Sequence, residues 1–513
     1  MKTARIRLIG LVSAALIIGS CTNLDENLRD SFTPNNFLKN SSELDAALLG
    51  AYSPIFGWNN HGNYFSMQEV PTDEAMIPQR GGDWYDGGQP AGMHTHGYAP
   101  NYDFVANLYN AAFGGVSACN RLLATPGLSD PYTVAELKVL RAYYYWVLLD
   151  NYGNVPLATE FGKSQGQKQR AEIYAFVDSE LTTNLPILKT KSTDPNSKTY
   201  GRLNYWAGQA IAAKLYLNAK VYTGTAQYDK AIAACDEIIN SGKYSLESNY
   251  KNIFKSDNKG SAEHIWVIPY DRLYGQGFNL VQMTLHYGSQ QTYNLQQQPW
   301  NGYCSLEDFY KSYSSGDVRK ANNFVVGPQL IYGTTKQVQD ASFEANDPDG
   351  AGLNFTPVVN ELAPNALRQA GARLGKFEFA IGALPNLDND VPLYRYADIL
   401  LTKAEALFRK GGTFGGDATG LLLVNNVRTR TGLDLYTGPI DLTETEFLAE
   451  RGREMAFESW RRNDLIRFGK FGAPFFGKQG TDVGNFKELF PIPLTAITAS
   501  AGEGTPLVQN PGY

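Results

Sequence analysis

The chain has 513 residues, which is enough for one large hydrophobic core or two modest ones. Hydrophobic residues make up 43% and charged residues 19%, as in ordinary globular proteins, and the net charge of −6 gives no reason to expect a nucleic-acid partner. Aromatic residues are abundant, with 31 Tyr, 26 Phe and 7 Trp against 5 His and 6 Met. Tyrosine-rich surfaces suit recognition, because the ring offers apolar area and the hydroxyl offers a hydrogen bond.

Residues 1–20 have the pattern of a bacterial lipoprotein signal peptide. A basic start is followed by an apolar stretch, Leu8 to Ile18, that is too short to span a bilayer. Cys21 comes directly after two small residues, so we expect it to be acylated and to anchor the mature chain in a membrane. The alternative is a plain secretory signal with an accidental cysteine. Residues 21–35 are polar and are predicted to form a flexible stalk.

Residues 36–513 are predicted to form a single, mainly α-helical domain. A helix is expected from Ser42 onward, and the clearest helical unit spans residues 203–242, which read as a helix, a short turn and a second helix. Small and aromatic residues recur there at the spacing of a tetratricopeptide repeat: Ala219, Tyr222 and Ala231. Residues 394–432 look like a second such pair. Because these pairs bury their faces only by stacking, we expect a superhelical scaffold at about 36–56, 102–250 and 392–470.

Two stretches interrupt the helical pattern, at about 57–101 and 250–391. Both are rich in Gly, Asn, Pro and aromatic residues and contain no long amphipathic helix. A structureless loop as long as the second stretch is uncommon in a compact domain. We therefore expect short helices, small strands and ordered loops, which form a loop-rich ligand lobe.

Residues 447–471 are the most specific segment. We predict a helix capped by Thr443 and Glu446, with four apolar residues packed inward and its charged residues in a partly buried network of ion pairs. The inward residues are Phe447, Ala456, Phe457 and Trp460, and the charged ones are Glu450, Arg453, Glu454, Glu458, Arg461 and Asp464.

This segment resembles the C-terminal signature of the SusD/RagB family of lipoproteins, which closes on Asp-Leu-x-Arg-Phe, here Asp464 to Phe468. Further matches follow the same order along the chain: the cysteine motif at Cys21, "LRAYYYWVLLDNYGNVPL", "LYRYADILLTKAEAL", "NNVRTRTGL" and "QNPGY". The resemblance implies a SusD-like fold and a non-catalytic lipoprotein of the outer membrane that faces the cell exterior. It also implies a partner, a SusC-like TonB-dependent transporter, and capture of oligosaccharides, with peptides as the RagB-like alternative. No cofactor is implied.

In this family the ligand face is built from loops outside the repeats, including the region after the first helix and the middle insertion. In "RGGDWYDGG" an indole or phenol ring could lie against the apolar face of a sugar, with charged side chains at the rim. A second turn, "PWNGY", presents another ring. The candidates are Arg80, Asp83, Trp84, Tyr85, Asp86, Tyr274, Tyr287, Trp300 and Asn301, with Trp58 as a weaker one. The alternative for each ring is packing in the core.

The sequence patterns for glycoside hydrolysis, metal binding and disulfide formation are weaker than the pattern for glycan binding. A glycoside hydrolase needs two carboxylates that flank the scissile bond, and Glu69, Asp73, Asp83 and Asp86 carry no mark of that role. His94-x-His96 lacks a third ligand, so no transition-metal site is predicted, and no calcium site can be read from the sequence. Beyond Cys21, the three remaining cysteines (Cys119, Cys235 and Cys304) are widely spaced, and no disulfide framework is predicted.

Overall fold

The computed structural model describes residues 41–189, 199–340, 350–502 and 506–513. The signal peptide, Cys21 and the stalk lie outside these residues. The chain divides into two compact units, Met1–Leu44 and Asp45–Tyr513. Of the first unit, only the start of helix α2 (Ser41–Phe56) is described. Within the described ranges, no helix is long and apolar enough to cross a membrane.

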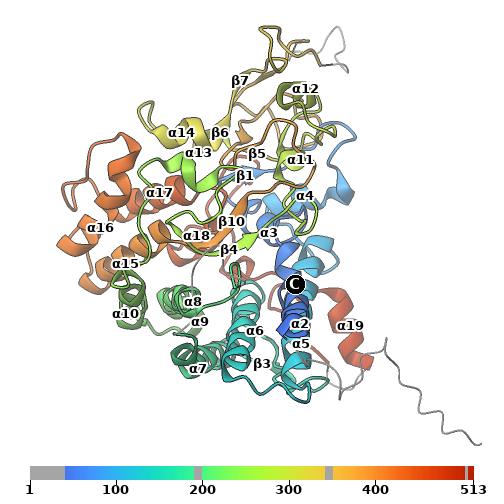
Figure 1. Ribbon diagram of the computed structural model, residues 1–513. Coiled ribbons are helices and arrows are strands. Elements are labelled where there is room, and N and C mark those ends of the chain that lie inside the picture. The colour runs from blue at the N-terminus through green and yellow to red at the C-terminus, as the bar shows by residue number, and fades with distance from the viewer. Residues whose placement is uncertain (1–40, 190–198, 341–349, 503–505) are drawn as a thin grey trace, which may run out of the picture. The chain divides into compact units, whose positions relative to one another are not determined.

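The second unit is mainly α-helical, as predicted, and its long helices lie side by side in a continuous row (Figure 1). Each helix of this row packs on the next: α5 (Asp103–Leu123), α6 (Pro131–Asn151), α7 (Arg170–Leu188), α8 (Tyr205–Leu217), α10 (Tyr228–Ile239), α15 (Tyr396–Gly411) and α16 (Ala418–Arg428). Both predicted helix pairs are confirmed, since α8 packs on α10 and α15 packs on α16. A short helix, α9 (Ala219–Thr223), continues α8 after Asn218. Ala219, Tyr222 and Ala231 are all buried, as repeat positions should be.

Small residues allow the helices of the row to approach closely. A β-carbon added at Gly115 of α5 would lie 2.2 Å from the ring of Tyr144 on α6. A β-carbon added at Gly208 of α8 would lie 2.1 Å from Leu185 of α7. Helix α6 is buried on nearly every face, which fits an apolar helix in the middle of a stack. Its N-terminus is capped by the side chain of Asp130.

The predicted helix over 447–471 is two helices, so the prediction of one continuous helix is wrong. Helix α17 (Glu444–Met455) ends before a turn, and α18 (Arg461–Arg467) follows it. In the turn, Phe457 and Ser459 have φ angles of 59° and 65°, which a helix cannot contain. Buried carboxylates hold this turn, because the N–H of Phe457 donates to Glu74 (3.2 Å) and that of Ser459 donates to Glu69 (2.7 Å).

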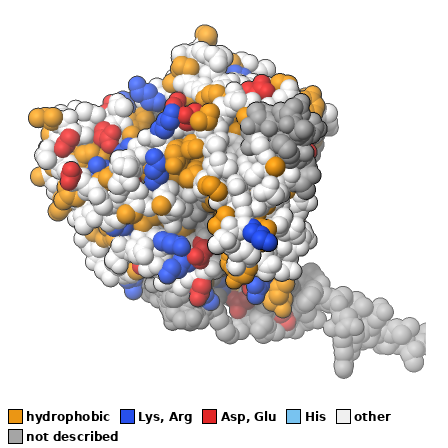
Figure 2. Space-filling model, turned by 90° about the horizontal axis from the view of Figure 1, so that it is seen from above, with side chains coloured by type: hydrophobic (Ala, Val, Ile, Leu, Met, Phe, Trp, Pro, Cys, Tyr) orange, Lys and Arg blue, Asp and Glu red, His pale blue; other side chains and the backbone are white. Residues whose placement is uncertain are grey.

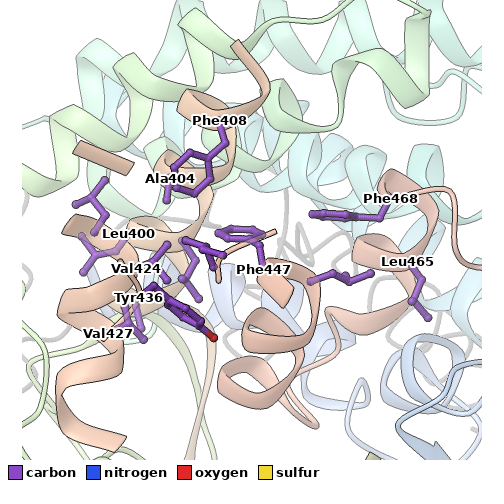
Figure 3. Packing of buried hydrophobic residues seen from close by; sticks show 14 of the residues in the cluster. Leu400, Ala404, Phe408, Val424, Val427, Tyr436, Phe447, Leu465 and Phe468 are labelled. Carbon is purple, nitrogen blue, oxygen red and sulfur yellow. The ribbon is translucent and has the colours of Figure 1, made fainter. Parts of the chain in front are cut away.

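A hydrophobic cluster joins these C-terminal helices to the last repeat pair (Figure 3). Its members come from α15, α16, α17, α18 and the segments that connect them. They include Leu400, Ala404, Phe408, Val424, Val427, Tyr436, Phe447, Leu465 and Phe468. The inward packing predicted for Phe447 is confirmed, since its ring is fully buried between Phe408 and Phe468.

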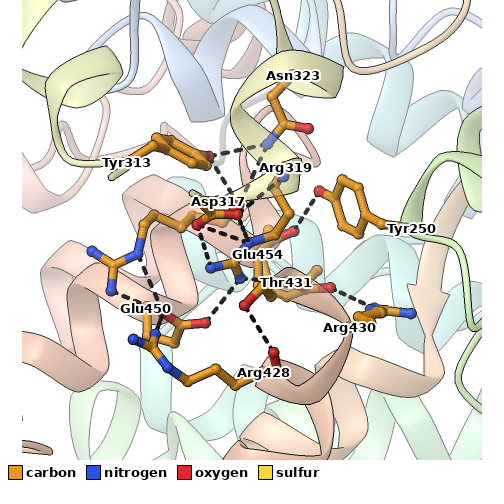
Figure 4. Close-up of polar contacts among 12 residues, drawn as sticks. Tyr250, Tyr313, Asp317, Arg319, Asn323, Arg428, Arg430, Thr431, Glu450 and Glu454 are labelled. Atoms are coloured by element: carbon orange, nitrogen blue, oxygen red, sulfur yellow. Dashed lines mark hydrogen bonds and ion pairs between the residues drawn. The ribbon is translucent and has the colours of Figure 1, made fainter. Parts of the chain in front are cut away.

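A buried ion network connects α17 to the insertion (Figure 4). Arg319 of α14 (Val318–Asn323) donates to Glu450 (2.9 Å) and Glu454 (3.1 Å). Arg395, at the end of strand β10 (Asp390–Arg395), donates to Glu454 (2.8 Å) and Glu458 (2.7 Å). Burial raises the pKa of Glu450, but the surrounding arginine charges outweigh this effect and lower its pKa to about 2. The network is thus more deeply buried than predicted, and several of its arginines come from outside the segment.

Where it is described (residues 250–340 and 350–391), the insertion contains only short elements, as predicted. An antiparallel pair, β4 (His264–Pro269) with β10 (Asp390–Arg395), brackets most of it, with Val391 opposite Ile268. The other pairs are two residues long: β1 (Ala75–Met76) with β5 (Cys304–Ser305), β6 (Phe324–Val325) with β9 (Arg373–Leu374), and β7 (Gly327–Pro328) with β8 (Asn354–Phe355). Figure 2 shows the molecule from above relative to Figure 1. On this face, small groups of hydrophobic side chains lie between charged side chains of both signs.

The remaining elements are short. They are α3 (Tyr64–Glu69), η1 (Asp86–Gly88), α4 (Gln89–His94), β2 (Val155–Pro156), β3 (Gln167–Lys168), η2 (Tyr250–Phe254), α11 (Leu280–Thr284), α12 (Ser289–Tyr293), α13 (Glu307–Lys311), η3 (Thr429–Thr431), η4 (Phe486–Glu488) and α19 (Leu494–Gly502). Cys119, Cys235 and Cys304 are free and buried.

Candidate functional site

Two loops that are far apart in the sequence enclose an open groove of about 530 Å³. One loop lies between β1 and η1 and the other lies between α12 and β5, and the segment between α11 and α12 adds Tyr287. The groove is lined by Asp83, Trp84, Asp86, Tyr287, Gln298, Pro299 and Trp300. Five of these seven residues were predicted as ligand contacts, so the structure brings together residues that the sequence could only nominate one by one.

Trp84 is held on its loop by contacts on several sides. Its indole N–H donates to the carbonyl of Trp300 (2.7 Å), which ties the two loops together. The rings of His61 and Tyr303 meet it edge to face, at centroid distances of 5.0 and 5.9 Å. A β-carbon added at Gly302 would lie 2.3 Å from the indole, so only glycine fits beneath this ring. The ring is therefore partly buried and fixed in position before any ligand arrives.

Trp300 forms the second aromatic surface of the groove. Its side chain is 41% exposed, which is high for a tryptophan. The ring centroids of Trp84 and Trp300 lie 6.5 Å apart, and their planes are inclined by 49°. The backbone N–H of Trp300 donates to the carbonyl of Gln282 in α11 (2.7 Å), so a helix supports the turn that carries this ring.

The acidic residues of the groove are each bound to a neighbouring aromatic side chain. The hydroxyl of Tyr287 donates to Asp83, and His61 lies 3.5 Å from Asp86. Burial lowers the pKa of His61, although the charge of Asp86 opposes this shift. Burial and the hydrogen bond to Asp83 raise the pKa of Tyr287, so its hydroxyl stays protonated as a donor at neutral pH.

Arg80 was predicted at the rim, and the structure corrects this prediction. Its side chain lies beneath the groove and is only 5% exposed. The guanidinium donates to backbone carbonyls of Asn301 (3.0 Å), Gly302 (2.9 Å) and Ala370 (2.9 Å). Arg80 therefore holds three loops together through the several N–H donors of its guanidinium. The local sequence does not indicate this structural role.

Two further candidates are buried and are wrong as ligand contacts. Asn301 is fully buried with a φ of 57°, and its side chain donates to the carbonyl of Arg368 (3.1 Å). Trp58 is fully buried between the rings of Tyr64 and Tyr143. Asn301 shapes the turn that presents Trp300, whereas Trp58 belongs to the core.

Two exposed tyrosines do not line the groove. Tyr85 is 55% exposed and sits between the two groove residues Trp84 and Asp86. Tyr274 is 92% exposed at the tip of the turn that follows β4, where its backbone N–H donates to the side chain of Asp271 (2.8 Å). The structure thus places Tyr85 next to the groove and Tyr274 outside it.

The sequence prediction missed residues that line or support the groove: His61, Gln298, Pro299, Gly302, Tyr303 and Arg368. The "QQQPWNGY" run contains four of them, and its proline and glycine indicate a turn that could have been used to predict these contacts. Arg368 could not be foreseen, because it reaches Tyr287 from a distant loop and lies 6.0 Å from the centre of that ring.

Of the carboxylates weighed for hydrolysis, Asp83 and Asp86 line the groove, whereas the other two and both histidines weighed for metal binding have contacts elsewhere. Glu69 is buried under the turn after α17, and Asp73 pairs with Arg461 (2.7 Å), so neither reaches the groove. His94 bonds to the carbonyls of Val70 and Phe476 (both 2.8 Å). His96 bonds to Asp482 (2.6 Å) and to the carbonyl of Pro71 (2.9 Å). Among the described residues, no cluster of three or more His, Cys, Asp or Glu side chains could hold a metal ion.

Comparison with known proteins agrees with the architecture. The sequence model of the SusD family matches residues 384–513. The chain is 26% identical to the starch-binding protein SusD of Bacteroides thetaiotaomicron, over 88% of this chain and 85% of that protein. Among solved structures it resembles surface glycan-binding protein A from the same organism, with a TM-score of 0.73 at 23% identity over 92% of this chain and 99% of that one. Surface glycan-binding protein A in complex with laminarihexaose gives a TM-score of 0.71 at 22% identity, over 92% and 99% of the two chains.

Proposed function

We propose that this chain, which resembles the SusD family in residues 384–513 and in its fold, is a non-catalytic glycan-binding protein of that family. It binds an oligosaccharide or a segment of polysaccharide in the groove between Trp84 and Trp300. It then delivers this ligand to a SusC-like TonB-dependent transporter of the outer membrane, where a lipid on Cys21 anchors it facing the cell exterior. It needs no cofactor for this task.

The observation that carries the proposal is the convergence of two indoles with hydrogen-bonding groups in one open groove. A pyranose has an apolar face of C–H groups, which packs against an indole, and a rim of hydroxyls that need partners. Asp83, Asp86 and Gln298 supply acceptors beside the rings, and charge-assisted hydrogen bonds are the stronger kind. Because Trp84 is fixed before binding, little entropy is lost in ordering the site.

Calorimetry with neutral and charged oligosaccharides, together with a peptide library, tests the ligand class. We expect saturable glycan binding that Trp84→Ala or Trp300→Ala weakens at least about tenfold, which is about 1.4 kcal/mol. Phe161→Ala, which removes a 51% exposed ring outside the groove, serves as the matched control and should leave affinity unchanged. Saturable peptide binding without any glycan binding would instead support the alternative that this protein binds peptides, as RagB-like members do.

Metabolic labelling with a palmitate analogue tests the anchor. The wild-type chain should carry label and sediment with outer membranes, together with a TonB-dependent transporter. Cys21→Ala should abolish the label and release the chain. Equal labelling of the two proteins would contradict acylation at Cys21.

A further inference from the structure

We infer that the groove selects uncharged glycans and rejects those that carry uronate or sulfate groups. The inference rests on the proposed function and adds the charge class of the ligand, which neither the fold nor the comparisons assign.

Every charged side chain that lines the groove, among the residues the structure describes, is acidic. These are Asp83 and Asp86, and the other lining residues are uncharged. Both carboxylates are exposed, and the side chain of Asp86 has a relative exposure of 51%. Asp83 and Asp86 flank Trp84 along the chain. A sugar seated on Trp84 therefore lies close to two negative charges.

The positive charges near the groove are engaged elsewhere. Arg80 stands behind the loops, and its guanidinium donates to backbone carbonyls. Arg368 reaches the ring of Tyr287 but forms an ion pair with Asp340. His61 contacts Asp86 from a largely buried position, and burial lowers its pKa, so it is neutral at neutral pH. None of these three is among the groove-lining residues.

An anionic sugar would therefore meet repulsion without a compensating partner. Recognition of a carboxylate or a sulfate in proteins relies on Arg, Lys or a row of N–H donors aimed at the anion. Like charges placed side by side across an interface oppose binding, and this effect weakens as salt screens it. Sugar hydroxyls, in contrast, can donate hydrogen bonds to both carboxylates.

The test compares each neutral oligosaccharide with its own carboxylated form. Laminarihexaose and maltohexaose, together with the same sugars oxidised at C6 to uronates, are titrated into the full-length protein by calorimetry, and an array of neutral, uronate-containing and sulfated glycans extends the comparison. At low ionic strength, the uronate form of any glycan that binds should bind at least about tenfold more weakly than the neutral form. Added salt should narrow this ratio.

The double variant Asp83→Asn, Asp86→Asn shows which charges are responsible. It weakens neutral binding through lost hydrogen bonds, but it should bring the ratio of neutral to uronate affinity close to one. The matched control is Asp229→Asn with Asp257→Asn, which removes two exposed acids outside the groove and should keep the wild-type ratio.

The outcomes separate this inference from the proposed function. Uronate or sulfated glycans that bind the wild type as tightly as neutral ones would overturn the charge selection and leave glycan binding intact. A ratio that the double variant does not change would also overturn it. Absence of binding to every glycan on the array would overturn the proposed function and this inference with it.

Discussion

Gly302→Ala is the sharpest test of how Trp84 is positioned. The added β-carbon would lie 2.3 Å from the indole of Trp84 and 2.8 Å from the carbonyl oxygen of Met283. Ordinary carbon contacts are about 3.5 Å or longer, so the ring must move by roughly 1 Å. A shift of this size breaks the hydrogen bond from the indole to the carbonyl of Trp300, which is 2.7 Å long.

The expected magnitudes follow from this displacement. Overpacking of this kind costs about 1–3 kcal/mol of stability, so the Tm should fall by only a few degrees. Glycan affinity should fall at least about tenfold, because the aromatic surface no longer matches the ligand. Calorimetric titration and a thermal melt measure the two effects separately.

Gly82→Ala, on the loop that carries Trp84, is the matched control. Its added β-carbon meets no atom within 4 Å, and Gly82 does not have a positive φ angle. This variant should bind and melt like the wild type. If Gly302→Ala bound glycan with wild-type affinity, glycan binding would not depend on the fixed position of the Trp84 ring. That result would refute the proposed role of Gly302.

Three further predictions concern stability. Arg395→Met leaves buried carboxylates without their partner and should lower the free energy of unfolding by about 3–5 kcal/mol in urea titrations, whereas the exposed Arg272→Met should change it by less than about 1 kcal/mol. Glu405 and Glu450 have pKa values lowered to about 2 by nearby arginines, so their stabilising contribution is present above the unfolded pKa and should be lost as the pH falls from about 4.5 to 2. Glu69 and its neighbour Glu74 behave oppositely, because burial raises the pKa of both carboxyls; stability should fall as the pH rises from about 4.5 to 7, and Glu69→Gln together with Glu74→Gln should reduce that slope in Tm. A flat pH profile of Tm in either window would contradict the corresponding assignment.

The groove shows why the site could be predicted only in part. Trp84, Asp83 and Asp86 stand out because large and charged side chains sit among glycines, and this pattern presents side chains outward. The same local pattern surrounds Arg80, which is buried because carbonyls from loops more than 200 residues away surround it. Trp58 likewise precedes a polar pair, yet three tyrosines enclose it.

The sequence by itself determined the helical pairs, the loop-rich insertion and the capping of α17 by Thr443, because periodicity and capping act within a few residues. Only the tertiary structure decided which rings face outward, which partners neutralise Glu454, and where the chain breaks between α17 and α18. Burial and ion pairing depend on residues brought together from distant parts of the chain. No local sequence pattern specifies these distant neighbours. The sequence therefore indicated which residue types could serve the site, but it did not indicate what surrounds each side chain in the fold.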